Sequence, residues 1–155
     1  MIIRLATVAD VPQMIPLINA AFSVEQFIDG TRTDPGRLPP MFDTGDFLVA
    51  EEDHRILASV YVEVRPEQRG YFGMLSVDPA QQGRGLGRRM VEAAEDHCRR
   101  QGCEVMDIMV VNLRTELPPL YRKLGYVEVG IEEFRPSRPL KDGVEAHCIV
   151  MSKPL

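Results

Sequence analysis

Several features are scarce or missing in this 155-residue chain. It has no run of 18 apolar residues, so no membrane-spanning helix is expected. Its first residues turn polar too early for a secretory signal. The three cysteines, Cys98, Cys103 and Cys148, are odd in number and include no C-x-x-C pair. We therefore expect neither a disulfide framework nor a metal site, and a reducing cytoplasm as the compartment.

Basic residues are fewer than acidic residues in this chain. The 18 Lys and Arg residues face 23 Asp and Glu residues, which gives a net charge of −5. This balance argues against nucleic acid as a partner and is compatible with a cationic amine as substrate. With 45% hydrophobic and 26% charged residues, the chain has the composition of a globular protein. Its length predicts a single domain over residues 1–155.

The order of hydrophobic patterns predicts an α+β fold with a central sheet. Apolar residues at spacings of three and four predict a helix from Val11 to Phe22 and another that begins at Leu86 and stops at Gly102. A short helix is expected over 117–124, and residues 23–46 are expected to form a loop with a short helical piece. Strands are predicted at 2–5, 47–50, 56–64, 71–77, 105–111, 126–131 and 146–151. On the outer face of the second helix the predicted ion pairs are Arg88–Glu92, Glu95–Arg99 and Asp96–Arg100.

The segment from Tyr71 to Gly87, YFGMLSVDPAQQGRGLG, is the most informative part of the chain. A strand opens through three glycines directly into a helix. Glycine lets the backbone approach an anion closely, and the first turn of a helix offers unpaired N–H groups. The alternative is that the glycines only form a tight turn. A Walker A loop is excluded because Arg88 and Arg89 follow Gly87, and a dinucleotide fingerprint is excluded because positions 88 and 90 are not glycine.

What remains is Gln82-x-x-Gly85-x-Gly87 after a strand, which resembles the Q/R-x-x-G-x-G/A signature of the GNAT superfamily of N-acetyltransferases. A second block, NLRTELPPLYRKLGY, resembles the family's strand ending in asparagine and the short helix that follows it with Tyr-x-x-x-Gly-Phe/Tyr. Asn112 and Tyr121 lie nine residues apart here, whereas the family usually places them about seven apart.

The resemblance implies a three-layer α/β/α fold whose mixed, mostly antiparallel sheet contains a splayed strand pair that admits acetyl-CoA. In that fold the glycine loop binds the pyrophosphate, and the pantetheine arm follows the strand before it. The backbone amide of Leu75 or Val77 would polarise the thioester carbonyl. The implied cofactor-binding residues are Leu75, Ser76, Val77, Gln82, Gly83, Arg84, Gly85, Leu86, Gly87, Arg88, Asn112 and Tyr121.

Acyl transfer to an amine requires two proton movements, and the sequence offers candidates for both. By resemblance Tyr121 protonates the leaving sulfur, since a phenol with a pKa near 10 still carries its proton at neutral pH. The alternative is that Tyr121 only packs against the sheet. Glu63, between two valines, is the candidate base, because an apolar setting raises a carboxyl pKa. The alternative is that Glu63 is an outward-facing strand residue, and other candidates for the base are Glu128, Glu132, Glu145 and His147.

The sequence as a whole predicts an N-acetyltransferase that moves the acetyl group of acetyl-CoA directly to a primary amine of a small molecule or peptide. No serine or cysteine has the partner that a covalent intermediate requires. We expect a monomer or homodimer that uses no metal and binds neither nucleic acid nor membrane. Two alternatives stay open: a non-catalytic module that binds acyl-CoA, and an acyltransferase with another acyl donor or a hydroxyl acceptor. Acceptor selectivity is expected in residues 21–45 and 134–144.

Overall fold

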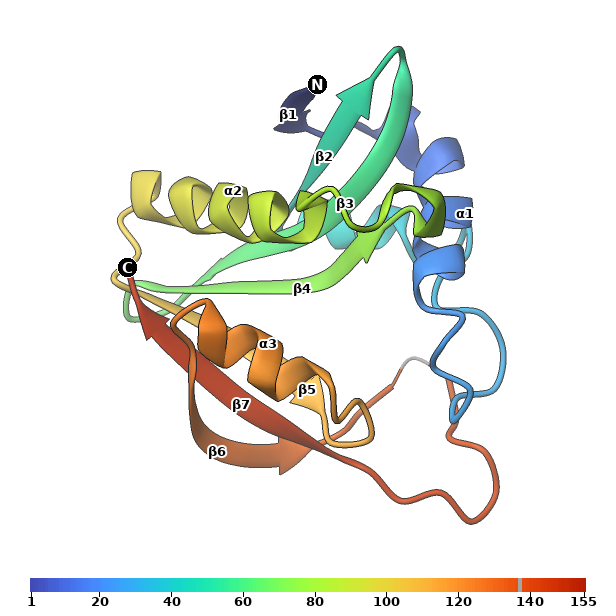
Figure 1. The fold of residues 1–155 in the computed structure, drawn as a ribbon, viewed down its shortest axis with the longest axis vertical. Coiled ribbons are helices and arrows are strands. Elements are labelled where there is room, and N and C mark those ends of the chain that lie inside the picture. Colours follow the sequence, from blue (N-terminus) through green and yellow to red (C-terminus); the bar gives the residue numbers. More distant parts are fainter. Residues whose placement is uncertain (137) are drawn as a thin grey trace.

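The computed structural model describes residues 1–136 and 138–155, which form one seven-stranded sheet with helices on both sides (Figure 1). The strand order is β1-β2-β3-β4-β5-β7-β6. Neighbouring strands are antiparallel except β4 and β5, which are parallel. The predicted α+β class and mostly antiparallel sheet are therefore confirmed. The strands are β1 (Ile2–Leu5), β2 (Asp46–Glu52), β3 (Arg55–Arg65), β4 (Arg69–Val77), β5 (Val105–Val111), β6 (Val127–Glu133) and β7 (His147–Pro154).

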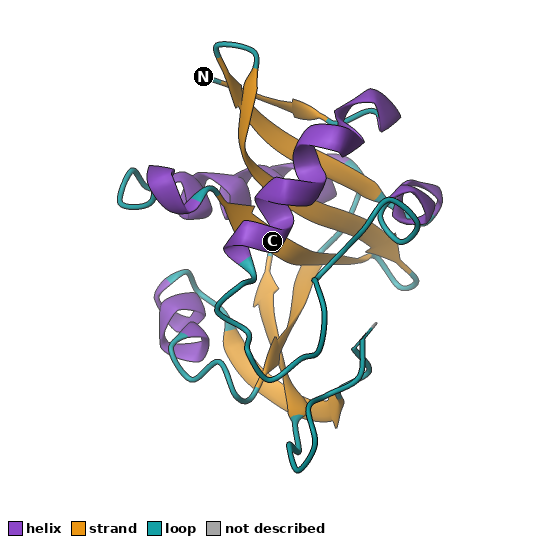
Figure 2. Cartoon of the chain, turned by 90° about the vertical axis from the view of Figure 1, so that its right-hand side faces the viewer, coloured by secondary structure: helices purple, strands orange, loops and turns teal. Residues whose placement is uncertain are grey.

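The α-helices lie where the hydrophobic spacing predicts them. They are α1 (Val11–Ala21), α2 (Leu86–Arg100) and α3 (Leu117–Lys123). Short 3-10 helices precede α1, interrupt the long loop and follow β4, at Val8–Asp10, Pro39–Asp43 and Pro79–Gln81. Figure 2 shows helices on either side of the strands, as a three-layer arrangement requires.

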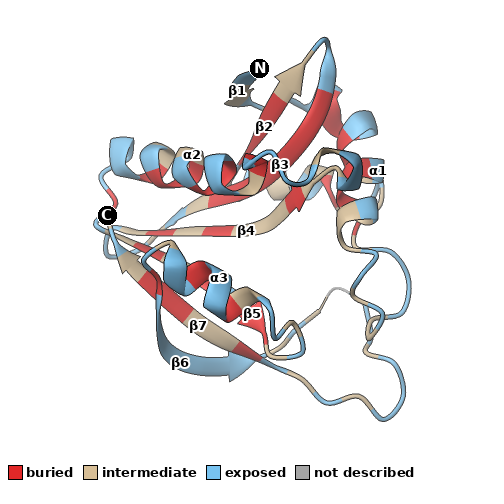
Figure 3. Ribbon diagram, viewed as in Figure 1, coloured by how far each residue is buried: buried red, intermediate tan, exposed pale blue. Residues whose placement is uncertain are grey.

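Two hydrophobic cores stabilise the fold, one on each face of the sheet. The first packs Met14 and Ile18 of α1 against Phe47 and Val49 of β2. The second packs α2 and α3 against the sheet and contains the fully buried Tyr126. Figure 3 shows these buried stripes along β2, β3 and the inner sides of the helices. The two cores meet at β4, which faces α1 with one set of side chains and α2 with the other.

On the outer face of α2, one of the three predicted ion pairs is confirmed and two differ. The Arg88–Glu92 pair is confirmed at 3.1 Å. The Glu95–Arg99 pair is wrong, because Glu95 is only 4% exposed and accepts hydrogen bonds from the Tyr126 hydroxyl at 2.7 Å and from Lys153 Nζ at 3.0 Å. Both partners come from later strands and turns of the chain, so no local spacing could reveal them. Asp96 consequently pairs with Arg99 at 2.7 Å instead of the predicted Arg100.

The parallel pair β4–β5 is joined only at one end. Its register covers Arg69–Val105, Gly70–Met106 and Tyr71–Asp107, after which the two strands separate. Figure 1 shows them leaving a common point near the C-terminus and diverging. The predicted splayed strand pair is therefore confirmed. Each strand keeps its other neighbour, β3 for β4 and β7 for β5, so the sheet opens without unpairing either strand completely.

Candidate functional site

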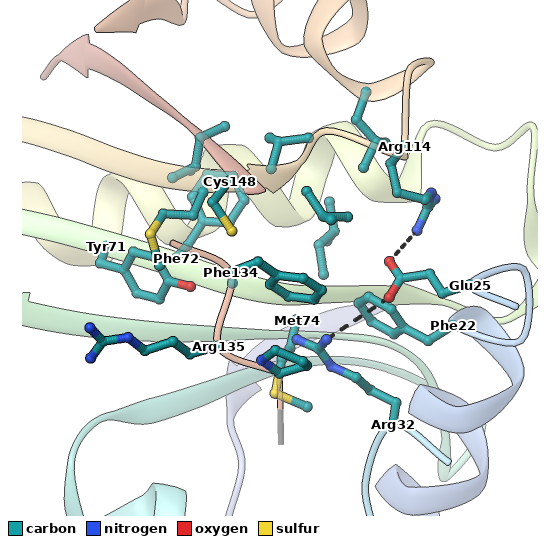
Figure 4. A pocket seen from close by; sticks show the side chains of 18 of the residues that line it. Phe22, Glu25, Arg32, Tyr71, Phe72, Met74, Arg114, Phe134, Arg135 and Cys148 are labelled. Atoms are coloured by element: carbon teal, nitrogen blue, oxygen red, sulfur yellow. Dashed lines mark hydrogen bonds and ion pairs between the residues drawn. The ribbon is translucent and has the colours of Figure 1, made fainter. Parts of the chain in front are cut away.

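A cavity of about 1030 Å³ opens where β4 and β5 separate. Its walls include Phe72 and Tyr121 from the α2 side of the sheet and Tyr71 and Met74 from the α1 side. The cavity therefore reaches both faces of the sheet through the gap between the strands. This volume is sufficient for a small ligand or for part of an extended one. Figure 4 shows the side chains that line it.

A bulge in β4 shapes one wall of this cavity. The register passes from Ser59–Ser76 to Tyr61–Gly73, so Met74 and Leu75 together oppose a single residue of β3. Met74 has a positive φ of 50°, which is uncommon for a residue other than glycine. Bulges bend a strand and redirect its backbone groups, often beside a site. Leu75 and Met74 both line the cavity as a result.

Two neighbours of Leu75 in the predicted cofactor set do not line the cavity with their side chains. The Ser76 hydroxyl is buried and donates to the Met74 carbonyl at 3.0 Å. Val77 packs against the core on the α2 side. Contact between these two residues and a ligand in the gap would therefore have to come through the backbone of β4.

The glycine loop lies between the end of β4 and the beginning of α2. Gly83 and Gly85 have φ values of 85° and 74°, and Gly85 is the N-cap of α2. A Cβ added at either position would meet no atom within 4 Å, so the space beside the loop is open. The loop thus combines a left-handed backbone with the unpaired N–H groups and positive dipole end of a 15-residue helix. These features fit an anionic group such as pyrophosphate.

Arg84 in the loop and Arg88 in the first turn of α2 each form an ion pair with a carboxylate. Arg84 contacts Glu52 of β2 at 3.3 Å and donates to the Gln81 side chain at 2.5 Å. Arg88 is bonded to Glu92 one turn further along α2. All of these ion pairs are exposed, so they cost little to exchange for a phosphate.

Tyr121 on α3 is 7% exposed and lines the cavity. Its ring lies 6.0 Å from the ring centroids of both Phe72 and Tyr126, which fixes its position. Within the described part of the chain, no group forms a hydrogen bond with its hydroxyl. Burial raises the pKa of Tyr121 to about 12, although the nearby Arg114 opposes the shift. The phenol therefore carries its proton at neutral pH and has it available for a group in the cavity.

Asn112, a predicted cofactor-binding residue, forms hydrogen bonds with β7 of the sheet. Its backbone N–H donates to the His147 carbonyl at 2.9 Å, and its Oδ1 accepts from the His147 N–H at 2.9 Å. These two bonds extend the β5–β7 ladder by one residue. Asn112 does not line the cavity among the described residues. Pro118 and Pro119, which stand between Asn112 and Tyr121, lie in the first turn of α3.

Glu63, the predicted base, also differs from expectation. Burial would raise the pKa of Glu63, but hydrogen bonds from the Tyr61 hydroxyl at 2.6 Å and Arg65 Nε at 2.9 Å hold that pKa below its usual value. The expected raised pKa is wrong, because the flanking valines point away from the carboxylate and two donors meet it. Glu63 is not among the residues that line the cavity. Its role as base stays a prediction without its original support.

The structure brings to the cavity several residues that sequence reasoning missed. Glu25, Arg32 and Arg114 meet at one end of it (Figure 4). Glu25 and Arg32 belong to the long loop after α1, which carries no periodic pattern, and Arg114 follows β5. The only available signal was the presence of charges in a proline- and glycine-rich segment.

Glu132 and Cys148 line the cavity from β6 and β7, where they are directly opposite in the register. Burial raises the pKa of the Cys148 thiol, and the Glu132 carboxylate raises it further. The thiol is therefore neutral at physiological pH. Glu132 itself has no hydrogen-bond or ion-pair partner in the described ranges, unlike Glu25 and Glu133 on the same cavity wall.

Residues 1–136 and 138–155 contain no group of three His, Cys, Asp or Glu side chains placed to hold a metal ion. No helix in these ranges has the length and apolar character needed to cross a membrane.

Comparison with known proteins gives a family by sequence and a similar fold among solved structures. Residues 43–128 match the family model described as the acetyltransferase (GNAT) domain. A mycothiol acetyltransferase from Saccharopolyspora erythraea is 29% identical over 124 residues, which cover 77% of this chain and 41% of that protein. One from Thermomonospora curvata is 29% identical over 100 residues, or 64% of this chain and 34% of the relative. The chain therefore matches well under half of the length of these curated relatives.

Among solved structures, the ribosomal-protein-alanine N-acetyltransferase of Brucella melitensis has a TM-score of 0.79 at 22% identity, with both chains fully covered. A putative acetyltransferase from Salmonella typhimurium, solved with its cofactor acetyl-CoA, has a TM-score of 0.77 at 22% identity and covers 100% of this chain and 94% of its own. At these identities the structural likeness concerns the fold.

Proposed function

The chain belongs to the GNAT family of acetyltransferases, and from that membership we propose that it moves an acetyl group from acetyl-CoA to a primary amine by direct transfer. The observation that carries the proposal is the cavity at the separation of β4 and β5, into which the protonated Tyr121 faces. If Tyr121 only packed against the sheet, its hydroxyl would not need to face a cavity. In the described part of the chain that hydroxyl has no hydrogen-bond partner.

The residues present fit acetyl-CoA. The loop from Gln82 to Gly87 would hold the pyrophosphate, and the backbone of Leu75 to Val77 would hold the pantetheine arm. Acetyl-CoA supplies the acetyl group as a thioester, whose carbon–sulfur bond is replaced by the carbon–nitrogen bond of the product. The bulge at Met74 and Leu75 supports a backbone N–H of β4 as the donor to the thioester oxygen. One such donor lowers the activation barrier by about 3–4 kcal/mol, because it stabilises the transition state.

Two protons leave the acceptor nitrogen, and the cavity offers a group for each movement. An amine with a pKa of about 10.4 is almost entirely charged at pH 7, so losing its first proton costs roughly 4.6 kcal/mol. Among the candidate bases, Glu132 is the carboxylate that lines the cavity with no side-chain partner in residues 1–136 and 138–155, so we assign it this proton. Tyr121 gives its proton to the departing sulfur and regains one from the second proton that the nitrogen loses.

Direct transfer is supported by the state of the one cysteine in the cavity. A covalent route needs a thiolate, and burial keeps the Cys148 thiol neutral. Its neighbour His147 points to the opposite face of β7, because adjacent strand residues alternate. It therefore cannot serve as the partner base for Cys148.

The acceptor is an amine-bearing small molecule in our proposal, with a peptide amine as the second possibility. We retain as proposals that residues 1–155 form one domain, that the protein is a monomer or homodimer, and that it works in the cytoplasm without a metal or nucleic acid. The three free thiols are compatible with a reducing compartment.

The test is thiol release from acetyl-CoA in the presence of a panel of amines, with product identification by mass spectrometry. N-acetylated product and stoichiometric free CoA are expected for some amines. Tight acetyl-CoA binding without thiol release from any acceptor would favour the non-catalytic acyl-CoA-binding alternative. Transfer to a hydroxyl, or faster turnover of another acyl-CoA, would favour the second alternative.

A further inference from the structure

Arg32 presents a guanidinium to the cavity with most of its donors unused. It lies in the loop after α1 and lines the cavity, and its side chain is 28% exposed. The guanidinium carbon is 4.6 Å from the centroid of the Phe22 ring, and Nη1 is 4.0 Å from Glu25 Oε1. Neither contact is a hydrogen bond, and none from this guanidinium occurs in the described part of the chain. An arginine has five N–H donors, so Arg32 can receive a planar oxyanion in two-point contact.

Glu25 is shared between Arg32 and Arg114, and its hydrogen bond goes to Arg114. Its side chain is 7% exposed, and Arg114 Nη1 donates to its Oε2 at 2.6 Å. Arg114 is held in turn by Glu116 at 2.6 Å, so its charge is compensated twice. Figure 4 shows Glu25 between the two arginines. The short contact to Arg114 and the long one to Arg32 leave the N–H donors of Arg32 without a hydrogen-bond acceptor among the described residues.

The same cavity is lined by a carboxylate that has no side-chain partner in the described ranges. Glu132 on β6 is opposite Cys148 in the register, and both line the cavity. Glu132 raises the pKa of the buried Cys148 thiol whereas Arg32 lowers it, so both charges lie near this one sulfur. Burial raises the pKa of Tyr71, which lines the same wall, and the charges of Arg65 and Arg32 oppose that rise. A guanidinium with unused donors and a carboxylate with no side-chain partner in the described ranges thus line one cavity, from segments about 100 residues apart in the sequence.

Apolar side chains also line this end of the cavity. Phe22, Met74 and Phe134 line it beside Arg32 (Figure 4). Phe22 also supports the guanidinium from one side. A ligand that reaches Arg32 therefore meets hydrocarbon and aromatic rings around its charged group.

From this arrangement we propose that the acceptor carries a carboxylate close to its amine, so that it is an amino acid with an apolar side chain. Arg32 binds the carboxylate, and the wall formed by Phe22, Met74 and Phe134 receives the side chain. The ammonium is then directed to the part of the cavity that Glu132 and Tyr121 line. The proposal rests on the proposed acetyl transfer and names the acceptor class of that site. It also explains how a chain with a net charge of −5 accepts a molecule that bears an anion.

The test compares matched acceptors that differ only in the carboxylate: L-leucine against L-leucinamide, and L-methionine against L-methioninamide. We expect kcat/KM for each acid to exceed that of its amide by at least about tenfold, which corresponds to about 1.4 kcal/mol. Arg32→Met should lower kcat/KM for the acids by a similar factor and leave the amides within about twofold. Arg135→Met is the matched control, because Arg135 also lines the cavity but is exposed and paired with Glu133 at 3.1 Å.

A binding measurement separates this inference from the proposed function. Calorimetry of N-acetyl-L-leucine and N-acetyl-L-leucinamide with the protein alone needs no turnover. We expect the acid to bind at least about tenfold more tightly than the amide, and Arg32→Met to remove the difference. Equal binding of the two compounds, or a preference that survives in Arg32→Met, would overturn the inference while acetyl transfer to other amines stands. A clear preference for the acid without any thiol release would uphold the anion site and contradict the proposed function.

Discussion

Arg69 and Asp107 tie β4 to β5 at the point where the two strands begin to separate. Arg69 Nε and Nη2 donate to the two oxygens of Asp107 at 2.6 and 2.7 Å, and the Ser152 hydroxyl of β7 donates to the same carboxylate at 2.5 Å. Register between the strands ends at Tyr71 and Asp107. The bidentate pair joins β4 to β5, and the Ser152 hydrogen bond adds β7. Together they hold the closed end of the gap, where the cavity starts.

This clamp predicts a pH-dependent stability. Burial would raise the pKa of Asp107, but Arg69 and Ser152 hold it below the usual 3.8. A carboxyl with a lowered folded pKa stabilises the fold above its unfolded pKa and loses that contribution as pH falls through the folded value. Asp107→Asn should lower the free energy of unfolding by about 1.5–3 kcal/mol at pH 7. The difference from the unmodified protein should shrink as the pH falls below 3.8 toward the lowered folded pKa of Asp107.

Urea unfolding at a series of pH values measures this effect. Asp96→Asn is the control, since Asp96 and Arg99 form an exposed pair on α2 that should contribute little. A loss in Asp107→Asn that is the same at every pH would show that packing, and not the charge of Asp107, holds the strands.

The glycine loop is tested with two glycines that have the same backbone conformation. Gly85→Val should weaken acetyl-CoA binding by at least about tenfold, because a side chain would stand where the phosphate approaches. Gly102→Val is the matched control: φ is 74° at Gly85 and 86° at Gly102, and an added Cβ meets no atom within 4 Å at either position. Calorimetry should show the loss in the first variant alone. Equal affinities in two folded variants would remove the loop from the site.

Tyr121→Phe should lower the turnover rate by about 10²–10⁴-fold, the usual contribution of a general acid. Acetyl-CoA affinity and stability should barely change, because the ring keeps its packing against Phe72 and Tyr126. Tyr126→Phe is the control within the same aromatic cluster. It removes the hydrogen bond to Glu95 and should cost stability, about 1–3 kcal/mol, more than rate. Normal turnover of Tyr121→Phe, with chemistry rate-limiting, would reduce Tyr121 to a packing residue.

The choice between the two candidate bases is decided by three matched substitutions. Glu132→Gln should reduce kcat by about 10²–10⁴-fold. Glu128→Gln on the same strand should have little effect, because Glu128 pairs with Arg122 at 2.6 Å and does not line the cavity. Glu63→Gln should also be nearly neutral in rate, since two donors engage that carboxylate. Steady-state kinetics with a large loss in Glu63→Gln and none in Glu132→Gln would restore Glu63 as the base.

Direct transfer predicts that the cavity thiol is dispensable. Cys148→Ala should keep kcat within about threefold of the unmodified protein, with at most a small loss of stability from the deleted sulfur. Mass spectrometry of the protein after incubation with acetyl-CoA should find no acetyl group on Cys148. A stable acetyl-enzyme whose decay matches turnover would establish a covalent route instead.

The sequence by itself determined the order of the elements, the glycine loop and the placement of Tyr121 on a short helix. These features depend on residues within one turn, strand or helix of each other, so their spacing is visible along the chain. The splayed pair and the family followed from the two motif blocks, and the strand ends needed only small corrections.

Only the tertiary structure decided which charged groups share the cavity. Arg114 and Glu25 are 89 residues apart, and Lys153 and Glu95 are 58 apart. Glu63 and Glu132 look alike in sequence, each a glutamate in a β-strand pattern, yet one is tied to a tyrosine and an arginine and the other faces the cavity without a partner. Which donors meet a carboxylate depends on how distant strands and loops pack together. Local periodicity carries no information about that packing, and this is why the family could be read from the sequence but the base and the anion site could not.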